Sequence, residues 1–219
     1  MIGISIPMEK AEMKHILLGL VKQVEGEALL LYWQVTRGTG MRGHAFGNTD
    51  SGPNLWAFVR PHQLRDTKAL YRCLTVEDRR YGYCHIKTLN LLPNVLASQQ
   101  AEEAGCDEAI FHRGERVTEC AHSNIHILSG GVLHTAPCDE KILPGITRAH
   151  ILSVCRAEGI PVVEKAFTLE DMMQADEVFF SSASALLCRV GEIDKKPVGG
   201  KDGQTLEAIR RGLEEDLLP

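Results

Sequence analysis

The strongest candidate for a chemically reactive residue is Lys87, in the segment Cys-His-Ile-Lys-Thr-Leu-Asn-Leu-Leu-Pro (residues 84–93). Apolar residues on both sides predict a half-buried lysine at the end of a strand. Burial disfavours the charged ammonium form, which makes the amine available as a nucleophile or a base near neutral pH. The alternative is a lysine whose stem lies on apolar surface while its charged end stays in water.

A carboxylate and a helix start provide two further candidate groups. Glu119 lies at the end of a predicted strand, and the alternative interpretation is an ordinary turn carboxylate. Gly145, Ile146 and Thr147 open a predicted helix, whose free N–H groups and dipole can bind an anion. The alternative there is a helix start that is capped by its own threonine.

Hydroxyl and basic side chains extend this set. Ser181, Ser182 and Ser184 follow a predicted buried strand and are either hydroxyl donors or parts of a polar turn. Arg42 and His44 lie in a glycine-rich loop, where a guanidinium group can hold a carboxylate through two parallel hydrogen bonds. A solvated basic loop is the alternative for that segment.

Three residues could suggest a metal site: Cys120, His122 and His126. Two histidines four residues apart bind a metal well on a helix, but this stretch is predicted as a strand. We therefore expect no metal.

These groups need a framework of strands and helices to position them. Helical spacing of apolar residues predicts helices, and short apolar runs between turn residues predict strands. The two types mix without strict alternation, so we expect an α+β or mixed α/β fold. Helices are predicted at residues 7–24, 91–104, 146–157, 168–175 and 204–216, and strands at 28–36, 54–59, 70–76, 108–112, 116–119, 124–128, 132–135 and 177–180.

Composition argues against several classes of protein. The 219 residues carry a net charge of -5 without any basic block, so we expect no nucleic-acid partner. The apolar runs are far too short to span a membrane. Seven cysteines at irregular spacing, with no Cys-x-x-Cys pair, favour reduced thiols and a cytoplasmic location.

In this order along the chain, the motifs resemble those of the fold-type-IV pyridoxal-phosphate enzymes. That family includes D-amino-acid aminotransferases, branched-chain aminotransferases and aminodeoxychorismate lyases. The D-amino-acid type is the most similar, because Thr88–Leu92 stands where branched-chain enzymes carry Gly-Gly-Asn-Tyr. The segments that carry the resemblance are Gln34–Thr39, Arg42–His44, Ile86–Leu92, Glu102–Ile110, Val117–Glu119, Ser123–Asn124, Leu143–Arg148 and Ala175–Phe179.

The resemblance implies transamination of D-amino acids, with D-alanine and 2-oxoglutarate as typical substrates and pyridoxal 5′-phosphate as the cofactor. Lys87 would hold the cofactor as a Schiff base and move the proton at the substrate α-carbon. Glu119 would face the pyridine nitrogen and keep it protonated. Ile146 and Thr147 would bind the phosphate at their helix start.

The remaining roles are also implied by the resemblance. Leu143 would pack on the cofactor ring, and Arg80 matches a family arginine close to the cofactor. Ser182 or Ser184 would replace a phosphate-binding hydroxyl that is lost at Ala183.

Substrate recognition and assembly are implied together. Arg42 and His44 would bind the substrate α-carboxylate, reaching in from the second subunit of a homodimer.

The resemblance also predicts the domain organisation. Residues 1–62 would be the remnant of a small N-terminal α/β domain that begins before Met1 in the family, and residues 63–219 the larger cofactor-binding domain. Because an early phosphate-binding arginine has no counterpart, we expect weak cofactor binding. The alternatives are a branched-chain aminotransferase, an aminodeoxychorismate lyase, or a truncated chain with little or no activity.

Overall fold

The computed structural model describes residues 2–46 and 51–217 of the chain. It divides into two compact units, residues 1–64 and 65–219, and each unit has its own sheet. This mixed α/β architecture confirms the predicted fold class. No helix within the described ranges is both long and apolar enough to cross a membrane.

The first unit combines one helix with a two-stranded hairpin. Helix α1 (Lys10–Val21) precedes strands β1 (Leu29–Thr36) and β2 (Asn54–Pro61), which pair antiparallel over their full length. Tyr32 and Phe58 stack on one face of this hairpin with ring centroids 5.2 Å apart. The helix is shorter than predicted at both ends, and Glu9, just before its first turn, keeps extended backbone angles.

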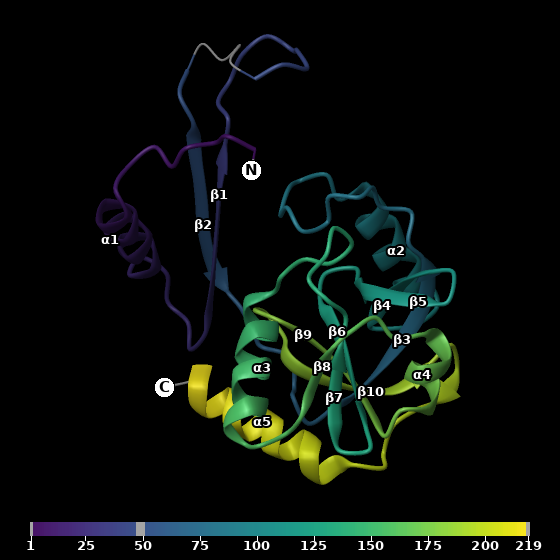
Figure 1. Cartoon of the computed structure of the whole chain (residues 1–219). Coiled ribbons are helices and arrows are strands. Elements are labelled where there is room, and N and C mark those ends of the chain that lie inside the picture. Colours follow the sequence, from purple (N-terminus) through teal and green to yellow (C-terminus); the bar gives the residue numbers. More distant parts are fainter. Residues whose placement is uncertain (1, 47–50, 218–219) are drawn as a thin grey trace. The chain divides into compact units, whose positions relative to one another are not determined.

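The second unit is built on a nine-stranded mixed sheet (Figure 1). Along the sheet the order is β5-β4-β3-β10-β9-β6-β7-β8, with β11 paired to β10. Strand β3 runs parallel to both of its neighbours, β4 and β10, whereas β9 and β6 continue the sheet antiparallel. The strands are β3 (Leu70–Glu77), β4 (Glu108–Arg113), β5 (Arg116–Cys120), β6 (Asn124–Ser129), β7 (Val132–Thr135), β8 (Val162–Glu164), β9 (Glu177–Ser182), β10 (Leu186–Ile193) and β11 (Lys196–Pro197).

Four helices accompany this sheet. Helix α2 (Leu92–Glu103) packs on β3 and β4, while α3 (Ile146–Ala157) contacts β9 and lies beside α5 (Gly203–Leu217), as Figure 1 shows. The short α4 (Leu169–Gln174) begins with a capping box. The predicted span of α3 is confirmed at both ends, which matters because its first turn belongs to the candidate site.

The sequence analysis did not predict three of the strands, β8, β10 and β11. Strand β10 is the important one, because it pairs with both β3 and β9 near the middle of the sheet. Its sequence contains the charged Arg189 and Glu192 with Gly191, which is typical of a loop. The structure accommodates the arginine by pairing it with Glu177 on β9, at distances of 2.8 and 2.7 Å between guanidinium nitrogens and carboxylate oxygens.

A buried histidine on β6 makes the stability of this unit sensitive to acid. His126 is fully buried, its Nε2 lies 2.9 Å from Ser181 Oγ, and its ring stacks on Phe179. Burial, helped by the positive charge of Arg148, lowers the pKa of His126 from 6.5 to about 3. Between these two values the imidazole of His126 binds a proton in the unfolded chain but not in the folded chain. The folded state therefore loses stability as the pH falls from 6.5 toward 3.

We predict that this one residue costs about 2 kcal/mol of unfolding free energy between pH 7 and pH 5. Urea unfolding of the parent and of His126→Gln at both pH values measures the effect, since glutamine keeps a polar partner for Ser181 and does not titrate. The parent should lose more stability than the variant on acidification. Equal losses in both proteins would contradict the prediction.

Candidate active site

Glu119 is the centre of a buried polar site. It is the second-last residue of β5, and a tight turn, closed by a hydrogen bond of 2.7 Å from Cys120 N to Ser123 O, leads directly into β6. This turn brings Asn124 back beside it, with Asn124 Nδ2 3.2 Å from Glu119 Oε2. The N–H of Leu143 donates to the same oxygen at 3.0 Å, so three segments meet at one carboxylate.

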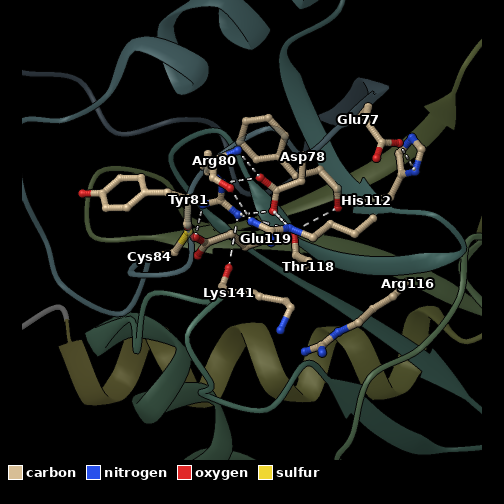
Figure 2. A network of polar contacts seen from close by, with 12 residues as sticks. Glu77, Asp78, Arg80, Tyr81, Cys84, His112, Arg116, Thr118, Glu119 and Lys141 are labelled. Atoms are coloured by element: carbon tan, nitrogen blue, oxygen red, sulfur yellow. Dashed lines mark hydrogen bonds and ion pairs between the residues drawn. The ribbon is translucent and has the colours of Figure 1, made fainter.

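The other oxygen of Glu119 is bound by Arg80, which donates to Oε1 from Nη1. Arg80 lies in the loop that follows β3. The Asp78 side chain accepts a hydrogen bond of 3.0 Å from the backbone N–H of Arg80, and this local turn ends the strand. Figure 2 shows Asp78, Arg80 and Glu119 pointing toward one another. The Arg80 guanidinium also lies over the ring of Phe111, 4.5 Å from its centroid.

Burial controls the electrostatics of this site. Burial raises the pKa of Glu119 to about 7, even though Arg80 and the Leu143 N–H favour its charged form. Burial also opposes ionisation of Asp78, but the hydrogen bonds and charge of Arg80 outweigh it and lower the pKa of Asp78. The site therefore holds one firmly ionised carboxylate and one that titrates close to neutrality, where a cationic donor could keep it charged.

The start of α3 lies next to this carboxylate. Gly145, its N-cap residue, makes no side-chain cap, so the first N–H groups of the helix receive no hydrogen bond from a side chain at that position. Thr147 is buried, whereas Ile146 is exposed. A Cβ atom added to Gly145 would lie 2.1 Å from Asn124 Oδ1, so only glycine allows this approach of the helix start to β6.

Two of the three predicted serines lie at the end of β9 rather than after it, and Ser184 follows the strand as predicted. Ser181 and Ser182 are the last two residues of that strand, and Ser181 is committed to His126. Ser182 Oγ and Ser184 Oγ are 3.4 Å apart on either side of Ala183.

The prediction that Lys87 is half-buried at the end of a strand is wrong. The lysine is exposed and lies in the loop between β3 and α2, ten residues beyond Glu77. Local turns shape this loop: Ile86 N donates to Tyr83 O at 3.0 Å, and Thr88 Oγ1 accepts Asn90 N at 3.3 Å. The apolar run around the lysine was misleading because its leucines are themselves exposed, for example Leu89 at 65%.

The substrate-loop candidates lie in the first unit. Arg42 and His44 are both exposed, and neither takes part in an ion pair or side-chain hydrogen bond within the described residues. The residues considered for a metal are separated: His126 points to Ser181, whereas His122 Nδ1 lies 3.1 Å from the buried Glu108. Cys120 is buried in the core.

Two members of the polar network were missed. Asp78 accepts both Arg80 and Arg113, and Thr118 Oγ1 lies 3.2 Å from its Oδ2. A carboxylate directly after the apolar β3, two residues before an arginine, was the available signal. Arg113 carried no such signal, because only the pairing of β4 with β3 and β5 brings it to Asp78.

Comparison with known proteins identifies the chain. Residues 1–193 match the family model for amino-transferase class IV. The chain belongs to the class IV aminotransferase family. A D-alanine aminotransferase of Listeria monocytogenes is 40% identical over 223 residues, which cover 99% of this chain and 76% of that protein.

Solved structures agree on the fold of this class IV aminotransferase. A Legionella pneumophila protein, provisionally named a 4-amino-4-deoxychorismate lyase, superposes with a TM-score of 0.87 at 23% identity, covering 98% of this chain and 80% of its own. A T.th. branched-chain amino acid aminotransferase gives a TM-score of 0.80 at 20% identity, covering 96% and 72%. That structure contains pyridoxamine 5′-phosphate, and class IV aminotransferases depend on pyridoxal 5′-phosphate.

The close approach of Gly145 to Asn124 yields a stability prediction. Gly145→Ala forces a methyl group against Asn124 Oδ1, and such overpacking costs about 1–3 kcal/mol. Urea unfolding should show this loss. The matched control is the same change in an Asn124→Ala background, where the obstacle is absent and the penalty should shrink to a fraction of its first value. An equal penalty in both backgrounds would contradict this account of the helix start.

Proposed function

We propose that this class IV aminotransferase transfers the amino group of D-amino acids to 2-oxo acids such as 2-oxoglutarate. The observation that carries the proposal is the buried Glu119 carboxylate beside the uncapped start of α3, in a chain 40% identical to a D-alanine aminotransferase. A carboxylate and a helix N-terminus at one place suit a ligand that has a cationic ring nitrogen and a phosphate group.

The residues present fit pyridoxal 5′-phosphate on two counts. The Glu119 carboxylate accepts from Arg80, Asn124 and Leu143, and a carboxylate has about four acceptor positions, which leaves room for one more donor. The N–H groups at Ile146 and its successors have no side-chain cap and suit a phosphate. When bound, the cofactor supplies the electron sink that makes the substrate α-proton removable.

The chain's own groups would carry the proton chemistry. Lys87 is our proposed attachment residue. Its exposed amine would take the proton from the α-carbon of the donor amino acid and, in the second half of the reaction, give a proton to the α-carbon of the amino acid formed from the 2-oxo acid. The Glu119 carboxylate would keep the ring nitrogen protonated. The positive charge on that nitrogen would in turn favour the ionised form of Glu119, whose pKa burial raises to about 7. Leu143, whose N–H donates to Glu119, would bring its side chain to the ring.

Further contacts are proposed for the phosphate and the substrate. Thr147 and the paired hydroxyls of Ser182 and Ser184 would add phosphate donors to the helix start. Arg42 and His44, exposed in their loop, would receive the substrate carboxylate, for which a guanidinium offers two parallel donors.

We further propose that two copies of the chain pair and that the protein works in the cytoplasm. Leu89, Leu91 and the α2 face formed by Leu92, Val95 and Leu96 leave large apolar side chains exposed, between 45% and 66% each. Large apolar side chains exposed together along a short segment suit a protein interface. The seven free cysteines suit a reducing compartment.

The proposed reaction is tested with D-alanine and 2-oxoglutarate as substrates. We expect the parent to form pyruvate and glutamate at a readily measured rate, and Lys87→Ala to lose at least about a thousandfold, since the general base contributes roughly 10²–10⁴-fold and the attachment is lost as well. L-Leucine in place of D-alanine should give little product. Faster turnover of L-leucine would favour branched-chain chemistry, and full activity of Lys87→Ala would overturn the assignment of the lysine.

The pairing is tested by sedimentation velocity. The parent should sediment as two copies, and the double variant Leu92→Glu, Leu96→Glu as one copy, because charge on an apolar interface is costly to desolvate. Gln204→Glu, at an exposed position of α5, is the control and should leave the dimer intact. A dimeric double variant would place the interface elsewhere.

A further inference from the structure

Asp78 is the most heavily engaged carboxylate of the polar network in Figure 2. Its side chain is completely inaccessible to solvent. It accepts two parallel hydrogen bonds of 2.9 Å from Arg80, through Nε to Oδ1 and Nη2 to Oδ2. Arg113 Nε and Thr118 Oγ1 donate to Oδ2 at 3.2 Å each. No further cation is needed to neutralise this group.

The two-point contact fixes the direction of the Arg80 fork. With Nε and Nη2 bound to Asp78, the remaining nitrogen, Nη1, is aimed at Glu119. The carbonyl of Lys141 accepts Nη2 at 3.2 Å, and the Phe111 ring lies against the guanidinium plane. A planar guanidinium held at one edge by a carboxylate cannot turn without breaking both bonds.

Arg113, Asp78, Arg80 and Glu119 form a row of ion pairs, and Arg113 lies at the end opposite to Glu119. Its Nη2 donates to the Arg80 carbonyl at 2.6 Å, and its Nε to Asp78 at 3.2 Å. Positive and negative groups therefore alternate from the partly exposed Arg113 through Asp78 and Arg80 to the buried Glu119.

We propose that Asp78 is a positioning residue for the reaction: through Arg80 it fixes both the place and the charge environment of the Glu119 carboxylate, with Arg113 as the outer counter-charge. The proposal rests on the proposed function, in which Glu119 faces the ring nitrogen of the cofactor. Asp78 itself has no proposed contact with substrate or cofactor.

The charges around Glu119 give this proposal a definite sign. Asp78 raises the pKa of Glu119 and Arg80 lowers it, while Arg113 offsets Asp78 from the far side. Neutralising Asp78 should therefore lower the pKa of Glu119, and neutralising Arg113 should raise it by a smaller amount. The titratable or charged groups that face this carboxylate are Asp78, Arg80 and Cys84 of the loop after β3, Cys120 of β5 and Cys138 before α3, and Arg113 of β4 lies behind Asp78.

The test follows the carboxyl carbon of Glu119 by NMR in the full chain labelled with ¹³C-glutamate, both without and with added pyridoxal 5′-phosphate. The signal is assigned by its absence in Glu119→Gln. In the cofactor-free protein, Asp78→Asn should move the titration midpoint down by about one pH unit and Arg113→Gln should move it up by less. Glu77→Gln is the control: this neighbouring carboxylate pairs with His112 instead and should leave the midpoint in place.

Kinetics of the cofactor-loaded protein provide the second measurement. Asp78→Asn should lower kcat by about ten- to a hundredfold, the range typical of residues that orient a primary ligand, and change KM for the amino acid by less than about twofold. If Asp78→Asn does not fold, the upward shift in Arg113→Gln still decides the matter. Midpoints that stay unchanged in every folded variant would overturn the proposal.

The two levels of inference can fail separately. If the two variants shift the Glu119 midpoint in opposite directions but the parent protein transaminates no amino acid, the positioning role of Asp78 is supported and the proposed function is overturned. Normal transamination with unchanged midpoints would do the reverse.

Discussion

The desolvation of one carboxylate organises the second unit. Glu119 is 5% exposed, and a buried charge must be paired and hydrogen-bonded or it is lost as a charge. Every polar partner that it receives comes from a different segment: Arg80 from the loop after β3, Asn124 from the start of β6, and the Leu143 N–H from the loop before α3. Movement of any one of these segments would remove a partner from the buried carboxylate, so the need to satisfy it holds them together.

The same requirement explains why the network is larger than a single ion pair. Arg80 is itself buried, and one carboxylate does not satisfy its five donors. Asp78 accepts two more of these donors and the Lys141 carbonyl a third, and Asp78 in turn pairs with Arg113. Two carboxylates and two guanidinium groups thus offset each other, and the row reaches partly exposed surface at Arg113. A buried row of this kind is specific in geometry, because a half-satisfied arrangement would be strongly unfavourable.

Sequence reasoning located the helices and most strands from apolar spacing, and it placed Glu119 at the end of β5 and Thr147 in the first turn of α3. It failed where charge stood inside a strand, as in β10, since the partner of Arg189 lies on another strand and cannot be read from local pattern. It also failed for Lys87, because exposed leucines produce the same apolar run as a buried strand. Arg113 was missed for a related reason: only the pairing of β4 with β3 and β5 brings it to Asp78, and no spacing rule encodes that pairing.

The position of β10 has a consequence for how the chain reaches this structure. Strand β3 must pair with β4, about 35 residues later, but its other neighbour β10 lies more than 110 residues further along the chain, where Leu70 pairs with Arg189. During synthesis, the sheet cannot close until nearly the entire unit has left the ribosome. One edge of β3 and one edge of β9 stay unpaired until then, and such edges can template association with other chains. Contacts this distant in sequence also slow the search for the native pairing. The same strand that joins the two halves of the sheet therefore delays the closing of this sheet during synthesis and lengthens the time for which two strand edges stay unpaired.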